Sequence, residues 1–144
     1  MTQGLDRPVA LVTGASRGLG AAIAADLAAA GYLVVGVARD SLALDRQVTA
    51  IGRDGFRPLV ADLTDVAELD SVIATVRREV GDPRVLVNNA GYGGPYALLH
   101  ETADAQWAQV MAITKHGGGF LAGHFHGVLG NGGAQNIVEP GDAF

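Results

Sequence analysis

The chain has 144 residues, a formal net charge of −5 and 49% apolar residues, which is enough for one domain with a buried core. The negative net charge argues against a nucleic-acid-binding surface, because such a surface needs a stripe of basic residues. No apolar run approaches the roughly 20 residues of a membrane span, and there is no cysteine for a disulfide or a thiolate metal site. The N-terminus also lacks the pattern of a signal peptide. We therefore expect a soluble, cytoplasmic protein that binds neither nucleic acid nor a membrane.

The first predicted unit is a strand, a glycine-rich turn and a helix. Val9–Thr13 is suited to a strand buried on both faces of a parallel sheet. The turn Thr13–Gly20 follows, and Leu19–Ala30 has helical spacing. Three apolar side chains are expected on one face of this helix: Leu19, Ile23 and Leu27. Free N–H groups in the first helical turn attract anions, and glycines let a pyrophosphate approach the backbone. The unit therefore predicts a dinucleotide site.

Three more strand-and-helix units are expected downstream. Strands are predicted at Leu33–Ala38, Arg57–Ala61 and Arg84–Asn88. Helices are predicted at Ser41–Ile51, from Thr64 or Asp65 to Val80, and from Thr102 through Ile113. Glu68 is expected to complete a capping box with Asp65. The apolar side of that helix is expected to hold Val66, Leu69, Ile73, Val76 and Val80. Four such units predict a doubly wound, Rossmann-like parallel α/β sheet of order 3-2-1-4, with a nucleotide site between the first and fourth strands.

Three short motifs follow the first, third and fourth predicted strands. They are TGASRGLG at Thr13–Gly20, ADL at Ala61–Leu63 and NNAG at Asn88–Gly91. Together they resemble the short-chain dehydrogenase/reductase family, over about Pro8 to Ile113, and within it the 3-oxoacyl-carrier-protein reductases. The resemblance implies that the adenine amine is contacted by Asp62 and that a backbone wall lies beside the nicotinamide ribose. The cofactor-binding residues that it implies are Gly14, Ser16, Arg17, Gly18, Leu19, Gly20, Asp62, Leu63, Asn88, Ala90 and Gly91.

Charge at the end of the second predicted strand indicates which nucleotide is preferred. Where NAD-preferring members of the family carry aspartate, this chain has Ala38, and Arg39 follows it. A free 2′-hydroxyl suits a carboxylate, whereas a 2′-phosphate needs cations. The guanidinium groups of Arg17 and Arg39 can both make bidentate contacts with such a phosphate. We expect the cofactor to be NADP(H), and we add Arg39 to the cofactor-binding residues.

The residues that carry catalysis in the resembled family do not have counterparts here. That family uses an asparagine, a serine, and a tyrosine four residues before a lysine, because hydride transfer must be matched by proton transfer. Trp107–Ile113 matches the approach to the asparagine, but Thr114 occupies its position. No serine follows Ser71, and Lys115, the single lysine, has no tyrosine four residues before it. The resemblance therefore covers the cofactor-binding half, and we assign no catalytic residue.

The composition changes after Ile113. Nine of the 21 glycines lie from Gly117 onward, and helical periodicity stops there. We expect a dinucleotide-binding domain at 1–113 and a divergent Gly/His-rich tail at 114–144, in which Asn136–Val138 can form a short fifth strand. The tail holds three of the four histidines, His116, His124 and His126, but no third well-placed metal ligand is evident, so they are interpreted as solvated.

Three functional interpretations stay open. The chain is a truncated or frame-shifted reductase, a catalytically silent NADP(H)-binding sensor or partner module, or a reductase completed by a second chain. If the parent was an enzyme, the resemblance implies a carbonyl or alcohol substrate, such as a 3-oxoacyl thioester. Without further strands, Val85–Val87 is expected at or near a sheet edge, which predicts a homo-oligomer or an aggregation-prone chain.

Overall fold

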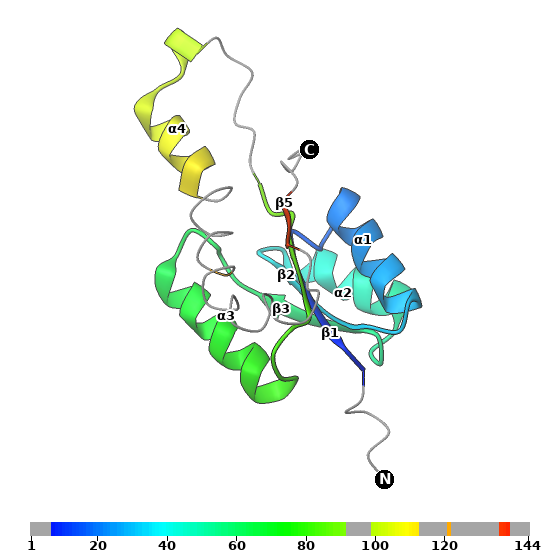
Figure 1. Ribbon diagram of the computed structural model, residues 1–144. Helices are drawn as coiled ribbons and strands as arrows, with labels where there is room; N and C mark the ends of the chain where they lie inside the picture. Colours follow the sequence, from blue (N-terminus) through cyan, green and yellow to red (C-terminus); the bar gives the residue numbers. More distant parts are fainter. Residues whose placement is uncertain (1–6, 92–98, 113–120, 122–135, 139–144) are drawn as a thin grey trace.

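A parallel sheet forms the centre of the protein. The computed structural model describes residues 7–91, 99–112, 121 and 136–138 (Figure 1). The five strands have the order β3-β2-β1-β4-β5, and every neighbouring pair is parallel. Their bounds are β1 (Val9–Thr13), β2 (Leu33–Ala38), β3 (Phe56–Val60), β4 (Val85–Asn88) and β5 (Asn136–Val138). The predicted order 3-2-1-4 is confirmed, and the short run at 136–138 does form a fifth strand.

Helices cover both faces of the sheet. They are α1 (Gly18–Ala29), α2 (Ser41–Ile51), α3 (Val66–Glu79) and α4 (Asp104–Met111), and a 3₁₀ turn lies at Leu99–Glu101. In Figure 1, α1 and α2 lie on one side of the sheet and α3 on the other, while α4 stands away from it. Within the described residues, no helix is long and apolar enough to cross a bilayer.

Alternating side chains of the strands enter two separate cores. In β1, Val9 and Leu11 face the core that contains α3, whereas Ala10 and Val12 face the core that contains α1 and α2. This follows from the two-residue period of a strand, and it confirms that β1 is buried on both faces. The α3-side core also contains Leu121, which is fully buried and belongs to the segment after Ile113.

Two residues expected in the apolar helix faces are exposed instead. Leu19 is 53% exposed and Val66 is 59% exposed. Each stands in the first turn of its helix, at the carboxyl end of the sheet, where the strands no longer cover the helix. The inward faces begin one turn later, with Ile23 in α1 and Leu69 in α3.

Two predictions about helix caps need correction. Asp65 does cap α3, accepting hydrogen bonds from the N–H groups of Ala67 (2.9 Å) and Glu68 (3.4 Å). Glu68 does not complete a capping box with it, because its carboxylate accepts from the N–H of Asp62 instead. Helix α4 is preceded by Ala103 rather than capped by Thr102, and the Gln106 side chain accepts from the Ala103 N–H at 3.1 Å.

Val85–Val87 is expected at or near a sheet edge, and β4 is the strand next to the edge. Strand β5 pairs with it in parallel, from Leu86 opposite Asn136 to Asn88 opposite Val138. The outer strands of the described sheet are therefore β3 and β5. Strand β3 contains Pro58, which has no N–H to offer a further strand and so suits an edge position.

Candidate cofactor-binding site

The turn between β1 and α1 depends on three glycines with two different roles. Gly14 and Gly18 have φ values of +64° and +58°, a left-handed conformation that side chains disfavour. A Cβ at Gly20 would collide with the carbonyl oxygen of Gly14, so the turn closes backbone against backbone at that point. A Cβ at Gly18 would meet nothing within 4 Å. Gly14 and Gly20 therefore serve packing, whereas Gly18 borders open space into which a ligand can approach.

Helix α1 begins without a side-chain cap. Arg17 occupies the N-cap position in an extended conformation, makes no capping hydrogen bond, and is followed by no acidic residue in the first turn. The helices α2 and α3, by contrast, begin with Asp40 and Asp65, whose carboxylates accept from first-turn N–H groups. An uncapped helix start presents N–H donors and the positive end of the helix dipole. A pyrophosphate fits this place beside Gly18 on both steric and electrostatic grounds.

Side chains at the ends of β1 and β4 hold the turn in place. The Thr13 hydroxyl donates to the carbonyl of Val87 (3.3 Å) and accepts from the N–H of Ala90 (3.0 Å). The Asn89 amide donates to the carbonyl of Gly14 at 3.2 Å. Thr13 and Asn89 are buried, and sequence reasoning did not assign them a role. The available signal was two polar side chains at the ends of otherwise apolar strands, where a buried polar group needs partners.

The residues predicted to lie beside the nicotinamide ribose are close in sequence to these hydrogen bonds. Asn88 is buried at the last position of β4, and Ala90 and Gly91 are half-buried just beyond it. They lie next to the end of β1, because β4 pairs with β1 from Ala10 opposite Val85 onward. The structure thus brings this segment alongside the glycine turn, as the strand order predicts.

Two contacts from α2 reach the turn from its other side. The Arg17 guanidinium lies 3.2 Å from the carboxylate of Asp40, and both side chains are largely exposed. The Gln47 amide donates to the carbonyl of Ser16 at 3.2 Å. Arg39, which precedes Asp40 at the end of β2, is exposed as well. The sequence analysis did not predict a role for Asp40 or Gln47, because none of the three motifs includes residues of α2.

Asp62 lies beyond the end of β3 and is held in a fixed geometry. One of its carboxylate oxygens accepts from both the hydroxyl (2.7 Å) and the N–H (2.9 Å) of Thr64. These two hydrogen bonds, assisted by the positive charge of Arg39, lower the pKa of Asp62 below its usual value. The Leu63 side chain is packed into the α3-side core, so only its backbone is available to a ligand.

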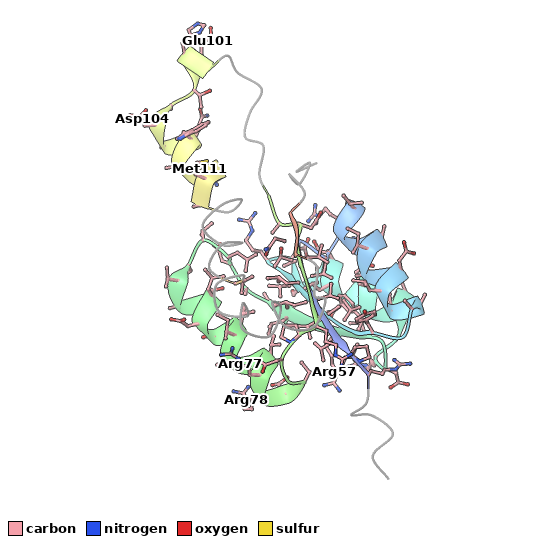
Figure 2. All side chains as sticks on the ribbon, in the orientation of Figure 1. Arg57, Arg77, Arg78, Glu101, Asp104 and Met111 are labelled. Carbon is pink, nitrogen blue, oxygen red and sulfur yellow. The ribbon has the colours of Figure 1, made fainter. Side chains whose placement is uncertain are left out.

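The predicted site residues follow the carboxyl ends of β1, β2, β3 and β4, and so they share one edge of the sheet. That edge is where an open α/β sheet binds its ligand. Figure 2 shows Arg57, Arg77 and Arg78 at the opposite end of the molecule, far from this edge. It also shows Asp104 and Met111 on the separate α4 segment.

Several residues of the sequence analysis lie outside the described residues. They include Thr114 and Lys115, together with His116, His124 and His126. Among the residues that the structure does describe, no group of three or more histidine or acidic side chains is arranged to hold a metal ion.

Comparison with known proteins identifies the family. The family model for short chain dehydrogenases matches residues 8–133. The chain belongs to the short-chain dehydrogenase family. The structure is similar to a short-chain dehydrogenase from Streptomyces avermitilis, with a TM-score of 0.77 and 37% identity over 85% of this chain and 44% of that one. A 3-ketoacyl-(acyl-carrier-protein) reductase from Brucella melitensis complexed with NADH also gives a TM-score of 0.77, at 28% identity, covering 83% of this chain and 49% of that one.

Relatives of this short-chain dehydrogenase chain include a reductase and a sugar-alcohol dehydrogenase. The 3-oxoacyl-[acyl-carrier-protein] reductase of Escherichia coli (strain K12) is 35% identical over 148 residues, covering 90% of this chain and 60% of the relative. The galactitol 2-dehydrogenase (L-tagatose-forming) of Cereibacter sphaeroides is 36% identical, covering 95% of this chain and 53% of the relative. The chain thus spans between about half and three fifths of the length of these relatives.

Proposed function

We propose that this chain is an NADP(H)-binding domain of a short-chain dehydrogenase, from the cytoplasm, and that it does not transfer hydride by itself. The observation that carries the proposal is the uncapped start of α1 behind Gly14, Gly18 and Gly20. This helix start has neither a side-chain cap nor an acidic residue in its first turn, and a bound phosphate would supply the missing acceptor. When bound, the nicotinamide group would supply or accept the hydride, and the residues of the chain would bind and orient it.

The preference for NADP(H) over NAD(H) is supported by charge at the ends of β1 and β2. Arg17 and Arg39 are both exposed at the edge of the sheet where the ribose of a bound dinucleotide would lie. Ala38 offers no carboxylate to a free 2′-hydroxyl. A 2′-phosphate carries charge that these guanidinium groups can neutralise through paired N–H donors. We propose that the 12 site residues predicted from the sequence together bind the NADP(H) molecule.

The proposal that this chain does not transfer hydride by itself is supported by the catalytic residue types that it lacks. The 144 residues hold no serine after Ser71 and no tyrosine four residues before a lysine. Without a positioned proton donor, a bound carbonyl substrate would not be reduced at a useful rate. A reductase completed by a second chain is the alternative, and its substrate would be a carbonyl or alcohol compound.

The segment after Ile113 is proposed to have diverged within the family and not to be out of frame. The family match continues to residue 133, Leu121 is buried in the α3-side core, and β5 pairs with β4. The test is to translate the gene beyond codon 113 in the other two frames. A Tyr-x-x-x-Lys pattern there, preceded by a serine-containing strand, would support a frame shift instead.

The central experiment is a titration of the purified chain with NADPH and, in parallel, NADH, followed by nucleotide fluorescence and melting temperature. We expect saturable binding of NADPH, weaker binding of NADH, and a melting temperature that rises with nucleotide concentration. A 3-oxoacyl thioester added to the complex should leave the NADPH absorbance unchanged. Absence of binding to either nucleotide would refute the proposed function, and steady oxidation of NADPH would refute catalytic silence.

Self-association is proposed from exposed apolar side chains. Trp107 on α4 is 54% exposed and Leu42 on α2 is 70% exposed, and burial of such side chains favours association. Sedimentation velocity should show species larger than a monomer at micromolar concentration. A single monomeric boundary over that range would contradict this part of the proposal.

A further inference from the structure

Hydrogen bonds from three other parts of the fold hold the backbone of the glycine turn. The N–H of Gly14 donates at 2.8 Å to the carbonyl of Val37, near the end of β2. The Gly14 carbonyl accepts from the Asn89 amide at 3.2 Å. The Ser16 carbonyl accepts from the Gln47 amide, also at 3.2 Å. Of these contacts, the one from Gln47 lies closest in sequence to the start of α1, where a phosphate is proposed to bind.

The packing of its neighbours on α2 holds Gln47 in place. Leu44 is fully buried, and Val48 and Ile51 pack against the core that contains α1 and α2. Residues three and four positions apart lie on the same side of a helix, so Gln47 stands at the border of this apolar stripe. In Figure 1, α1 and α2 cover the same face of the sheet. The half-buried Gln47 side chain therefore reaches the turn from a firmly packed helix.

The hydrogen bond from Gln47 sets the direction of the peptide between Ser16 and Arg17. No peptide bond of the described residues is cis, and in a planar trans peptide the N–H points opposite to the carbonyl. Because the Ser16 carbonyl points to Gln47, the N–H of Arg17 points away from α2. Arg17 is the N-cap residue of α1, and its N–H is one of the four at a helix start that have no acceptor inside the helix.

The strand order puts the predicted nucleotide site on the side of the turn away from α2. Helix α2 packs on β2 and β3, to one side of β1, whereas the site is predicted between β1 and β4, to the other side. If the peptide turned over, the Ser16 carbonyl would present its negative end to the phosphates in place of the N–H donor. The contact from Gln47 opposes this rotation. Because the amide is neutral, it acts on the phosphates that NADPH and NADH share.

We propose that Gln47 is a positioning residue for nucleotide binding. Its amide holds the Ser16–Arg17 peptide so that the N–H of Arg17 is directed at the pyrophosphate of the bound nucleotide. The inference rests on the proposed function, since it concerns the same site. It predicts that loss of the amide weakens the binding of both nucleotides by the same factor.

The test compares the parent chain with Gln47→Met. Methionine is unbranched and favours a helix about as well as glutamine, but it has no N–H donor. The Kd values for NADPH and NADH are each expected to rise about fivefold, the scale of one hydrogen bond, with their ratio unchanged. Gln47→Ala also lacks the donor and favours a helix, so it replaces this variant if circular dichroism shows that Gln47→Met does not fold.

Two small probes distinguish positioning from a general loss of structure. ADP contains the pyrophosphate group, whereas adenosine contains no phosphate. In Gln47→Met, the Kd for ADP should rise by the same factor as the Kd for the dinucleotides, while the Kd for adenosine should not change. A partly unfolded chain would bind both probes more weakly. Neither probe involves the nicotinamide group or any turnover.

Thr49→Val is the matched control on the same helix. The Thr49 hydroxyl donates to the carbonyl of Asp45 at 3.2 Å, the same length as the contact from Gln47 to Ser16. Both substitutions remove one side-chain donor to a backbone carbonyl, but the bond of Thr49 stays within α2 and does not reach the turn. Thr49→Val should bind NADPH and ADP as the parent chain does.

The outcomes separate the inference from the proposed function. If the parent chain binds NADPH and Gln47→Met binds it equally well, this inference is wrong and the proposed function stands. The inference is also wrong if only one of the two dinucleotides is weakened, if adenosine is weakened as much as ADP, or if Thr49→Val shows the same loss. If the parent chain binds neither NADPH nor NADH, the proposed function fails and the inference fails with it.

Discussion

The starts of α1 and α3 stand at the same edge of the sheet and are built in opposite ways. Helix α3 begins with the capping carboxylate of Asp65, carries Glu68 in its first turn, and has two arginines in its last turn. Each of these features stabilises a helix through capping or through its dipole. Helix α1 begins with a cation, Arg17, and has no cap, no acidic first turn and no basic last turn.

This difference shows where the chain departs from the rules of helix stability. Sequences that specify a structure follow local rules everywhere except at functional or strained sites. The start of α3 obeys them, whereas the start of α1 leaves N–H donors for the anion that we propose binds there. The difference between the two helix starts can be tested by substitutions that act on one start and spare the other.

The largest expected effect is that of Gly20→Ala. The new methyl group would collide with the carbonyl oxygen of Gly14, and backbone cannot yield as a flexible side chain does. We expect a loss of about 3 kcal/mol in the free energy of unfolding, the upper range for overpacking, measured by urea denaturation. Nucleotide binding should be lost as well, because the turn can no longer close.

Gly18→Ala is the matched variant on the same turn. A Cβ there meets nothing within 4 Å, so the only folding cost is the left-handed φ, about 1 kcal/mol. It should nevertheless weaken NADPH binding, since the methyl group enters the space that the pyrophosphate needs. If Gly18→Ala binds NADPH as well as the parent chain, the phosphate does not lie over Gly18.

Thr13→Val is expected to have the next largest effect. Valine has a similar shape but leaves the partly buried N–H of Ala90 without the hydroxyl acceptor and the carbonyl of Val87 without the hydroxyl donor. An unsatisfied buried group costs about 1–3 kcal/mol, so unfolding should require about 2 kcal/mol less. Thr13→Ser keeps both hydrogen bonds and should recover most of the loss in the same denaturation experiment. Equal stability of the two variants would contradict the role assigned to the hydroxyl.

The sequence predicted the sheet well, because its strands are apolar runs separated by recognisable turns. The bounds of β1, β2 and α2 agree with the prediction, and α1 and β3 are shifted by one residue. The first helical turns were less predictable. Leu19 and Val66 fit the apolar period of their helices, but period alone does not show where the sheet stops covering a helix.

The places of the candidate residues in the fold were predictable where a motif follows its own strand. The glycine turn and Asp62 are examples, since each directly succeeds β1 or β3. The contacts of Asp40 and Gln47 were not predictable, because they join a turn to a helix more than 20 residues later in the sequence. Such contacts depend on how α1 and α2 pack on the same face, which no local pattern encodes.

The next smaller effect on stability is expected from two opposite substitutions, one that adds a cap to α1 and one that removes the cap of α3. Arg17→Ser adds a capping hydroxyl to α1 and should raise the free energy of unfolding by about 0.5–1 kcal/mol while it weakens NADPH binding. Asp65→Ala removes the cap of α3 and should lower the free energy of unfolding by about 1 kcal/mol. NADPH affinity should not change in this second variant. Melting curves with and without NADPH measure both quantities, and parallel changes in stability and affinity would refute the contrast between the two helix starts.

The smallest expected effect is on the pH dependence of stability, and it comes from Asp62, just before α3. The hydrogen bonds from Thr64 lower the folded-state pKa of Asp62, so the ionised carboxylate stabilises the fold. A lowered folded-state pKa contributes stability above the unfolded-state pKa, near 3.8, and that contribution is lost as the pH falls further through the folded-state value. Asp62→Asn should therefore be slightly less stable than the parent chain at pH 7, and the gap should narrow as the pH is lowered to 3. Urea midpoints at the two pH values measure this. A gap that stays constant would mean that Asp62 acts through the shape of the Thr64 turn and not through its charge.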